Sequence, residues 1–237
     1  MSGLERSPEP TEIVELERGP VLVFAPHPDD EVVGVGGTCR RHALAGDEVR
    51  VVVAYDGALG NRGYENEVPA AFVARRQTEC RAACDALGYA SVNFLGHPEN
   101  HELSTDDLEK GAAQMAALMA DAAPRTVYAP WPGESHVDHH QLGLAVGRAF
   151  ERYAREASGP VDLWFYEIWS TFRPTRVVDI TRQWPDKEHA LRLHATQVSA
   201  RDIVHYIEGL NAYRSLHIDR PGVTHAEAFV GSEEVTW

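Results

Sequence analysis

Short apolar runs alternate with longer amphipathic segments along most of the chain. Runs rich in valine and aromatic residues begin at Val21 and recur at residues 49–55, 91–95 and 126–129, a pattern that predicts buried strands. The segments 38–45, 67–87, 108–122 and 141–155 predict helices. Strand, helix and strand in direct succession form a βαβ unit, which requires a parallel sheet with right-handed crossovers.

The second half of the chain is less regular. Residues 162–168, 176–180 and 226–230 predict further strands, and residues 183–198 and 202–216 predict helices. Neither an internal repeat nor a low-complexity linker divides the sequence. We therefore expect one αβα sandwich domain over residues 1–237, in which the polar residues 1–19 form an N-terminal arm or a short strand docked at an edge.

Composition and charge argue against nucleic acid and the membrane interior as partners of this chain. With 43% hydrophobic and 24% charged residues, the chain has an ordinary globular composition. A formal net charge of -14 disfavours nucleic acid as a partner, because its phosphate backbone would be repelled. The N-terminal residues lack a secretory signal, and no apolar run is long enough to span a bilayer. We expect a cytoplasmic protein, and the composition is compatible with a monomer or a homo-oligomer.

The three cysteines, Cys39, Cys80 and Cys84, predict small buried side chains in a reducing compartment. Cys80 and Cys84 are one helical turn apart. This spacing alone is a weak sign of metal or redox chemistry.

The first predicted strand ends abruptly in charged residues. Pro26-His27-Pro28 stops the apolar run, and three consecutive acids at 29–31 follow. In open α/β sheets, ligands bind at the carboxyl ends of the strands. The alternative is a solvated acidic turn, but adjacent acids repel one another unless a cation or hydrogen-bond donors offset their charge. The segment therefore favours a metal site.

A second cluster follows the fourth predicted strand, in Glu134-Ser135-His136-Val137-Asp138-His139-His140. If His136 begins the next helix, His136 and His139 lie one turn apart on a shared face. Surface histidines at a helix start would explain this segment equally well if it stood alone. Because strands one and four are neighbours in a common doubly wound order, both clusters can meet in one crevice.

Two histidines and a carboxylate, with other positions open to water, are what a catalytic Zn²⁺ requires, and the same ligands suit non-haem Fe²⁺. Successive side chains diverge, so Asp29 and Asp30 cannot both be good ligands of one ion. We expect one of them to bind the metal and the other to act as general base toward water.

Ala25-Pro26-His27-Pro28-Asp29-Asp30-Glu31 resembles the A-H-P-D-D-E signature of the PIG-L/LmbE family of metal-dependent N-deacetylases, with a proline inserted after Ala25. His136-Val137-Asp138-His139 resembles the family's H-P-D-H motif, with valine in place of proline. Residues 76–79, 87–88 and 94–99 resemble its intervening R-x-x-E, L-G and F-L-G-x-x-D series. The likeness runs from about Val21 to Ala149 and implies a Rossmann-like αβα sandwich with a mostly parallel central sheet.

The resemblance also implies roles by position. It implies metal ligands at His27, Asp30 and His139, a general base at Asp29, an oxyanion-stabilising histidine at His136, a histidine-orienting carboxylate at Asp138, and substrate contacts at Arg76 and Glu99. Glu134 stands where the mycothiol-pathway members have tyrosine, which disfavours that particular substrate.

Further substrate contacts are suggested by position alone. Four aromatic residues are candidates to stack on a sugar ring, although core packing is the commoner role of each: Tyr55, Trp131, Trp164 and Trp169. Trp131, between two prolines beside the second motif, is the first to test. His97 and His101 follow the third predicted strand and are candidates to line the same pocket.

The leading hypothesis is a zinc hydrolase that removes the acetyl group from an N-acetylglucosamine-type sugar conjugate. The alternative is a metal-dependent amidase that acts on a non-sugar or thiol-conjugate amide. A non-haem iron oxygenase suits the ligand set but fits neither the acid pair nor the resemblance. A metal-stabilised binding module would require a closed coordination shell, which leaves the second aspartate without a role.

Overall fold

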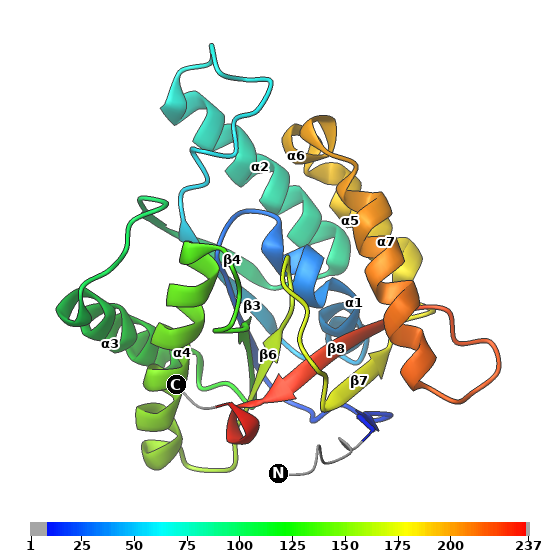
Figure 1. The fold of residues 1–237 in the computed structure, drawn as a ribbon. Helices are drawn as coiled ribbons and strands as arrows, with labels where there is room; N and C mark the ends of the chain where they lie inside the picture. Colours follow the sequence, from blue (N-terminus) through cyan, green and yellow to red (C-terminus); the bar gives the residue numbers. More distant parts are fainter. Residues whose placement is uncertain (1–8, 236–237) are drawn as a thin grey trace, which may run out of the picture.

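The computed structural model describes residues 9–235, which form an eight-stranded sheet with helices on both faces (Figure 1). The strand order is β1-β7-β8-β6-β5-β2-β3-β4, and among the described strands only β8 runs antiparallel to its neighbours. The strands are β1 (Thr11–Glu12), β2 (Val21–Ala25), β3 (Val49–Tyr55), β4 (Ser91–His97), β5 (Thr126–Pro130), β6 (Asp162–Tyr166), β7 (Arg176–Asp179) and β8 (Ala226–Gly231). The αβα sandwich with a mostly parallel sheet is thereby confirmed.

The helices cover the two faces unequally. They are α1 (Asp30–Leu44), α2 (Pro69–Leu87), α3 (Thr105–Ala122), α4 (Val137–Glu156), α5 (Trp184–Leu193), α6 (Ala195–Ala200) and α7 (Ile203–Arg214), with short 3₁₀ turns at Ser215–His217 and Ser232–Glu234. One core packs between the sheet and α1, α2, α5 and α7, and the other between the sheet and α3 and α4. Of the described helices, none is long and apolar enough to cross a membrane.

Alternation along the central strands explains the two cores. Val21, Val23 and Ala25 of β2 contribute to the core with α1, whereas Leu22 and Phe24 contribute to the core with α3 and α4. All five side chains are buried. A strand covered on both faces requires such a continuous apolar run, and for this reason β2 could be predicted from the sequence.

Strands β2 and β5 lie side by side at the centre of the sheet and run parallel, as predicted for the first and fourth strands. The chain leaves β2 toward β3 on one side and reaches β5 on the other, so the direction of winding reverses between β2 and β5. This is the topological switch point at which α/β folds bind ligands. The two charged motifs therefore lie at one edge of the sheet.

Helix α1 packs very closely on the sheet. A Cβ atom on Gly34 would lie 2.0 Å from Cδ2 of Tyr166, and one on Gly37 would lie 2.7 Å from Cδ1 of Ile180. The predicted helix start at residue 38 is wrong, because α1 already begins at Asp30. Glycine disfavours helices intrinsically, but here its missing side chain permits the close packing that stabilises the helix.

A fully buried ion pair ties α1 to the opposite end of the described chain. Lys187 Nζ of α5 lies 2.6 Å from Glu227 Oε1 of β8 and also donates to the carbonyl of Val33. The Glu227 carboxylate accepts hydrogen bonds from the backbone N–H groups of Gly37 and Thr38. Buried charges are tolerated when they are paired and hydrogen-bonded in this way.

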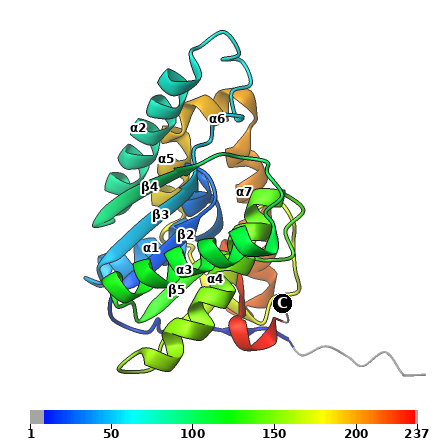
Figure 2. The ribbon, with the colours of Figure 1, turned by 90° about the vertical axis from the view of Figure 1, so that its left-hand side faces the viewer.

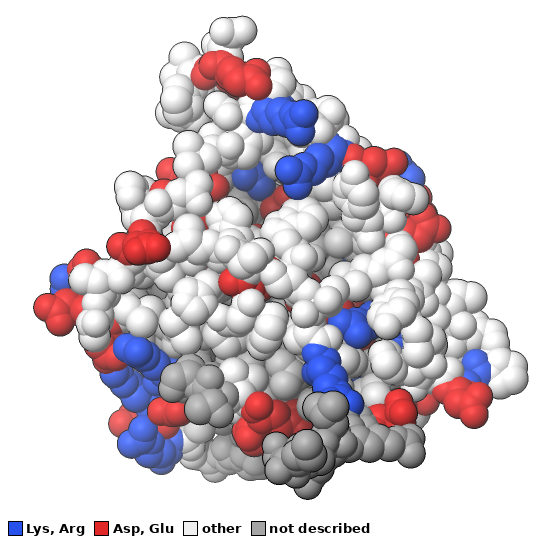
Figure 3. Space-filling view, in the orientation of Figure 1, with Lys and Arg blue, Asp and Glu red and all other residues white. Residues whose placement is uncertain are grey.

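One other prediction differs in detail from the structure, and the short edge strand expected within residues 1–19 is confirmed. The predicted helix 183–198 is divided into α5 and α6 at His194, whose ψ of 59° is not helical. In the predicted N-terminal arm, β1 pairs with β7 at the sheet edge, while residues 1–8 lie outside the described residues. Figure 2 shows the layers from the side, and Figure 3 shows acidic and basic side chains interspersed over one face.

Candidate active site

The two charged motifs meet at the carboxyl ends of β2 and β5. His27 lies in the short turn between β2 and α1, and Asp30 is the first residue of α1. His136 is the N-cap of α4, and its Nδ1 accepts a hydrogen bond from the backbone N–H of Asp138. His139 lies in the first turn of the same helix. Each side chain is thus held at the end of a regular element, which restricts its orientation.

Three donor atoms converge at the centre of this site. His27 Nδ1 lies 3.1 Å from Asp30 Oδ2 and 3.2 Å from His139 Nε2, and the latter two atoms are 3.4 Å apart. Ligands bound to one tetrahedral zinc ion at about 2.0–2.1 Å are about 3.4 Å from one another. The three side chains are almost fully buried. The residues present therefore fit a divalent metal ion.

Protonation favours the same interpretation. Burial opposes ionisation of Asp30, but His139 and His27 outweigh this and lower its pKa to about 2. Burial lowers the pKa of His139 to about 4, so its imidazole is neutral near pH 7. A carboxylate and a neutral imidazole are the forms that bind metals.

The other side of the His27 ring is held by two carboxylates. Its Nε2 lies 3.1 Å from Asp138 Oδ2 and 3.2 Å from Glu99 Oε1. Burial opposes a charge on His27, but the hydrogen bonds to Asp138 and Asp30 outweigh it and raise its pKa to about 10, so a metal ion would bind His27 by displacing a proton from its ring. Carboxylates that bind the outer nitrogen of a histidine fix its tautomer and strengthen it as a metal ligand.

Asp29 lies beside the converging atoms in a strained conformation. Its φ of 150° and ψ of -27° are rare for a residue other than glycine. Its Oδ1 accepts a hydrogen bond from Arg76 Nη2 at 3.1 Å, and its backbone N–H donates to Glu31 Oε2. Burial raises the pKa of Asp29 to about 7, although Arg76 opposes the shift. A carboxyl group with such a pKa can both accept and return a proton near pH 7.

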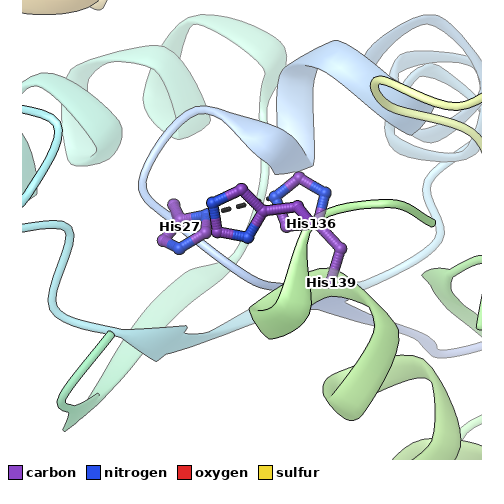
Figure 4. A group of neighbouring side chains, drawn as sticks. All are labelled: His27, His136 and His139. Atoms are coloured by element: carbon purple, nitrogen blue, oxygen red, sulfur yellow. Dashed lines mark hydrogen bonds between the residues drawn. The ribbon is translucent and has the colours of Figure 1, made fainter. Parts of the chain in front are cut away.

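His136 lies close enough to the centre to serve there as well. Its ring stacks on His139 with centroids 4.6 Å apart and lies edge-on to His27 at 5.2 Å (Figure 4). The ligand atoms of these three histidines lie within 4.8 Å of one another. With 34% of its side chain exposed, His136 faces the pocket more openly than the buried His139. It is therefore placed either to bind a metal or to contact substrate.

The site opens into a pocket of about 290 Å³. It is lined by His27, Asp29, Asp30, Leu59, Gly60, Arg76, Glu99, Asn100, His136, His139, Trp169, Gln197 and Arg201. Arg76 is committed to the carbonyls of Pro28 and Gly57 in addition to Asp29. Arg76 therefore holds the turn at residues 28–29 and the loop at Gly57 in place, in addition to lining the pocket.

Several expected pocket residues lie elsewhere. Trp131 packs on Phe172 and lines a different cavity, whereas Trp169 lines this pocket. His97 and His101 line a neighbouring, largely apolar cavity of about 440 Å³. Sequence reasoning missed the pocket residues Gln197 and Arg201, because α6 and the turn after it carry no motif that links them to the distant strand ends.

Glu134 supports the loop that carries Trp169. Its carboxylate accepts hydrogen bonds from the backbone N–H groups of Ile168, Trp169 and Ser170. Its Oε2 also lies 3.9 Å from His139 Nδ1. Glu134 thus connects the loop on the pocket rim to a side chain at the centre of the site.

The sequence and fold are similar to those of known deacetylases. Residues 22–150 match the family model PIG-L, described as GlcNAc-PI de-N-acetylase. A 1D-myo-inositol 2-acetamido-2-deoxy-alpha-D-glucopyranoside deacetylase of Kineococcus radiotolerans is 29% identical, over 83% of this chain and 74% of that protein. A diacetylchitobiose deacetylase of Thermococcus kodakarensis is 28% identical, over 75% of this chain and 69% of that protein.

Solved structures agree with this assignment. The N,N'-diacetylchitobiose deacetylase of Pyrococcus horikoshii matches with a TM-score of 0.76 at 25% identity, over 90% of this chain and 83% of that chain. A 4-carboxy-2-hydroxymuconate hydratase from Pseudomonas putida has the same TM-score at 21% identity and shares the fold alone. Because the family model spans more than half of its residues, this chain belongs to the PIG-L family.

Proposed function

We propose that the protein is a zinc-dependent N-deacetylase that removes the acetyl group from an N-acetylglucosamine-type sugar conjugate. The observation that carries the proposal is the convergence of His27 Nδ1, Asp30 Oδ2 and His139 Nε2 within 3.1–3.4 Å of one another, beside the carboxyl group of Asp29. The deacetylases of Kineococcus and Thermococcus support the substrate class, since their names describe deacetylases of acetylated amino sugars.

His27, Asp30 and His139 would hold the ion. A bound zinc ion supplies Lewis acidity, which makes both an amide carbonyl and a water molecule more reactive. Asp29 accepts the proton of the water that attacks the carbonyl carbon. Because Arg76 binds its Oδ1, the other oxygen of Asp29 is available for this transfer.

The remaining steps require one hydrogen-bond donor and one acid. His136, which is partly exposed to the pocket, donates a hydrogen bond to the oxyanion of the tetrahedral adduct. Asp29 then returns its proton to the nitrogen, so that the C–N bond breaks and the sugar leaves as an amine. A raised pKa suits Asp29 to both transfers.

Aromatic and polar groups at the rim would bind the sugar. Trp169 is 40% exposed and offers an apolar face on which a pyranose ring can stack. Gln197 and Arg201 line the same opening and offer hydrogen-bond donors to hydroxyl groups. Of the aromatic residues that the sequence suggested for this role, the proposal assigns it to Trp169 and not to Trp131.

The test is amine release from a panel of N-acetylglucosamine conjugates that includes the inositol conjugate and diacetylchitobiose. We expect release by the zinc-loaded protein and none by an Asp29→Ala variant that still binds zinc. Absence of release from every conjugate, with zinc bound stoichiometrically to the wild type, would reject the sugar substrate class.

A further inference from the structure

A second group of metal-ligand side chains lies next to the candidate active site, on the other side of Glu31. Glu31 belongs to α1 and is completely buried, and Cys80 and Cys84 face it from successive turns of α2. The ligand atoms of these three residues lie within 4.8 Å of one another, and Cys80 Sγ is 3.2 Å from Glu31 Oε1. No residue of this group is among the donor atoms that converge at His27.

His194 approaches Glu31 of this group from a third element. It occupies the break between α5 and α6, and its Nε2 lies 3.3 Å from the same Glu31 Oε1. The residue is 1% exposed, yet among the described residues neither ring nitrogen has a hydrogen-bond partner of acceptable geometry. Buried polar groups in native proteins are nearly always satisfied, so an imidazole whose one close polar contact is the Glu31 carboxylate is consistent with a bound ligand at this point.

We propose that Glu31, Cys80, Cys84 and His194 form a second metal site, which binds a structural zinc ion. Two sulfurs, one imidazole and one carboxylate are four ligands of the types that zinc prefers, and four protein ligands close its tetrahedral shell. Around such an ion, neighbouring nitrogen and oxygen ligands are about 3.3 Å apart, and sulfur and oxygen ligands about 3.5 Å. The distance of 3.3 Å from Glu31 Oε1 to His194 Nε2 fits this geometry, whereas the distance of 3.2 Å from Glu31 Oε1 to Cys80 Sγ is shorter and corresponds to a thiol hydrogen bond that an ion would replace.

The site would join three helices at one point. Helices α2 and α5 run side by side in both ribbon views, and α1 packs against both (Figures 1 and 2). Glu31 Oε2 accepts the backbone N–H of Asp29 at 3.0 Å. An ion that fixed Glu31 would therefore also support the strained turn at Asp29, without touching a substrate.

Cobalt provides a signal that belongs to this site alone. Thiolate ligands give bound Co²⁺ an intense near-ultraviolet charge-transfer band, whereas His27, Asp30 and His139 contain no sulfur. The full-length protein is stripped of metal under reducing conditions and titrated with Co²⁺. We expect two equivalents per chain, one of which produces the charge-transfer band.

Matched variants show which residues bind the cobalt ion that gives the charge-transfer band. Cys80→Ser/Cys84→Ser should lose the band and one equivalent, while Cys39→Ser, which changes a buried cysteine outside the group, should keep both. His27→Ala/His139→Ala should keep the band and bind one equivalent, and it decides the question if the cysteine variant fails to fold.

Absence of the band from the wild type, or its persistence without Cys80 and Cys84, would overturn the proposal. Either result would leave the amine-release assay unaffected, so the two proposals fail separately.

Discussion

Asp29 combines three properties at the residue scale: a strained backbone, a charged partner and a raised pKa. Strain of this kind costs on the order of 1–3 kcal/mol and persists only where the surroundings enforce it. Arg76 and Glu31 provide that enforcement through hydrogen bonds to the side chain and to the backbone N–H. In the proposed mechanism this strain has a function, because it holds the Asp29 carboxylate toward the reacting water molecule.

We predict that Asp29→Asn lowers kcat on the order of 10²–10⁴-fold, because the amide cannot accept the proton of water. Metal content should be unchanged, since the asparagine oxygen can still accept from Arg76. Amine release and metal analysis on the same preparation measure both quantities. Loss of metal from this variant would show that Asp29 is a ligand and not a base.

The three histidines can be separated by metal content. His27→Ala and His139→Ala should each lose the ion of the active site, because each removes one of the converging donors. His136→Ala should retain it and lose turnover. Equilibrium dialysis with Zn²⁺, carried out in a Cys80→Ser/Cys84→Ser background, counts only this site. A His136→Ala protein without metal would favour the ligand set of three histidines.

The sequence predicted the candidate metal ligands of the pocket better than the residues that line the rest of it. His27 and Asp30 are three residues apart, as are His136 and His139, so their chemistry is visible in short motifs. Trp169, Gln197 and Arg201 come from separate segments, and only tertiary packing brings them to the pocket. No short sequence motif predicts that these three residues lie in one pocket.

At the scale of elements, helix α1 shows how packing overrides local preference. Three glycines within residues 34–37 disfavour a helix by about 1 kcal/mol each relative to alanine. Contacts with Tyr166 and Ile180 leave no room for a Cβ at Gly34 and Gly37, so these glycines allow the helix to lie on the sheet. The strands were easier to predict because their apolar runs depend on burial alone.

The ion pair beneath α1 gives a measurable consequence. Glu227→Gln should lower the free energy of unfolding by about 3–5 kcal/mol, because it leaves the buried Lys187 without its counter-charge. The change can be measured by urea unfolding near pH 7. Glu188→Gln is the matched control, since Glu188 pairs with Arg192 on the exposed face of α5 and should change stability little. Equal effects of the two substitutions would mean that burial gives the Lys187–Glu227 pair no special weight.

At the scale of the whole molecule, the buried His42 should make the stability of the folded protein depend on pH. His42 of α1 bonds to Asp47 through Nδ1 and to the hydroxyl of Tyr128 on β5 through Nε2. Burial lowers the pKa of His42 in the folded state, although Asp47 opposes the shift. The unfolded chain therefore binds more protons below about pH 6.5, the ordinary pKa of histidine.

Stability should consequently fall as the pH is lowered from about 7.5 through 6.5 and toward the depressed folded pKa. His42→Gln should lessen this fall, because glutamine does not titrate. Urea midpoints of both proteins at about pH 7.5 and 5.5 test the difference. An identical fall in the two proteins would mean that His42 is not responsible.

The position of β8 has a consequence for biosynthesis. This strand lies between β7 and β6 inside the sheet, yet it follows every other described strand in the chain. Until residue 231 leaves the ribosome, β6 and β7 expose unpaired edges and Lys187 lacks Glu227. The nascent sheet therefore remains incomplete while the other described strands are synthesised, accessible to chaperones and proteases, and it closes only when β8 is inserted.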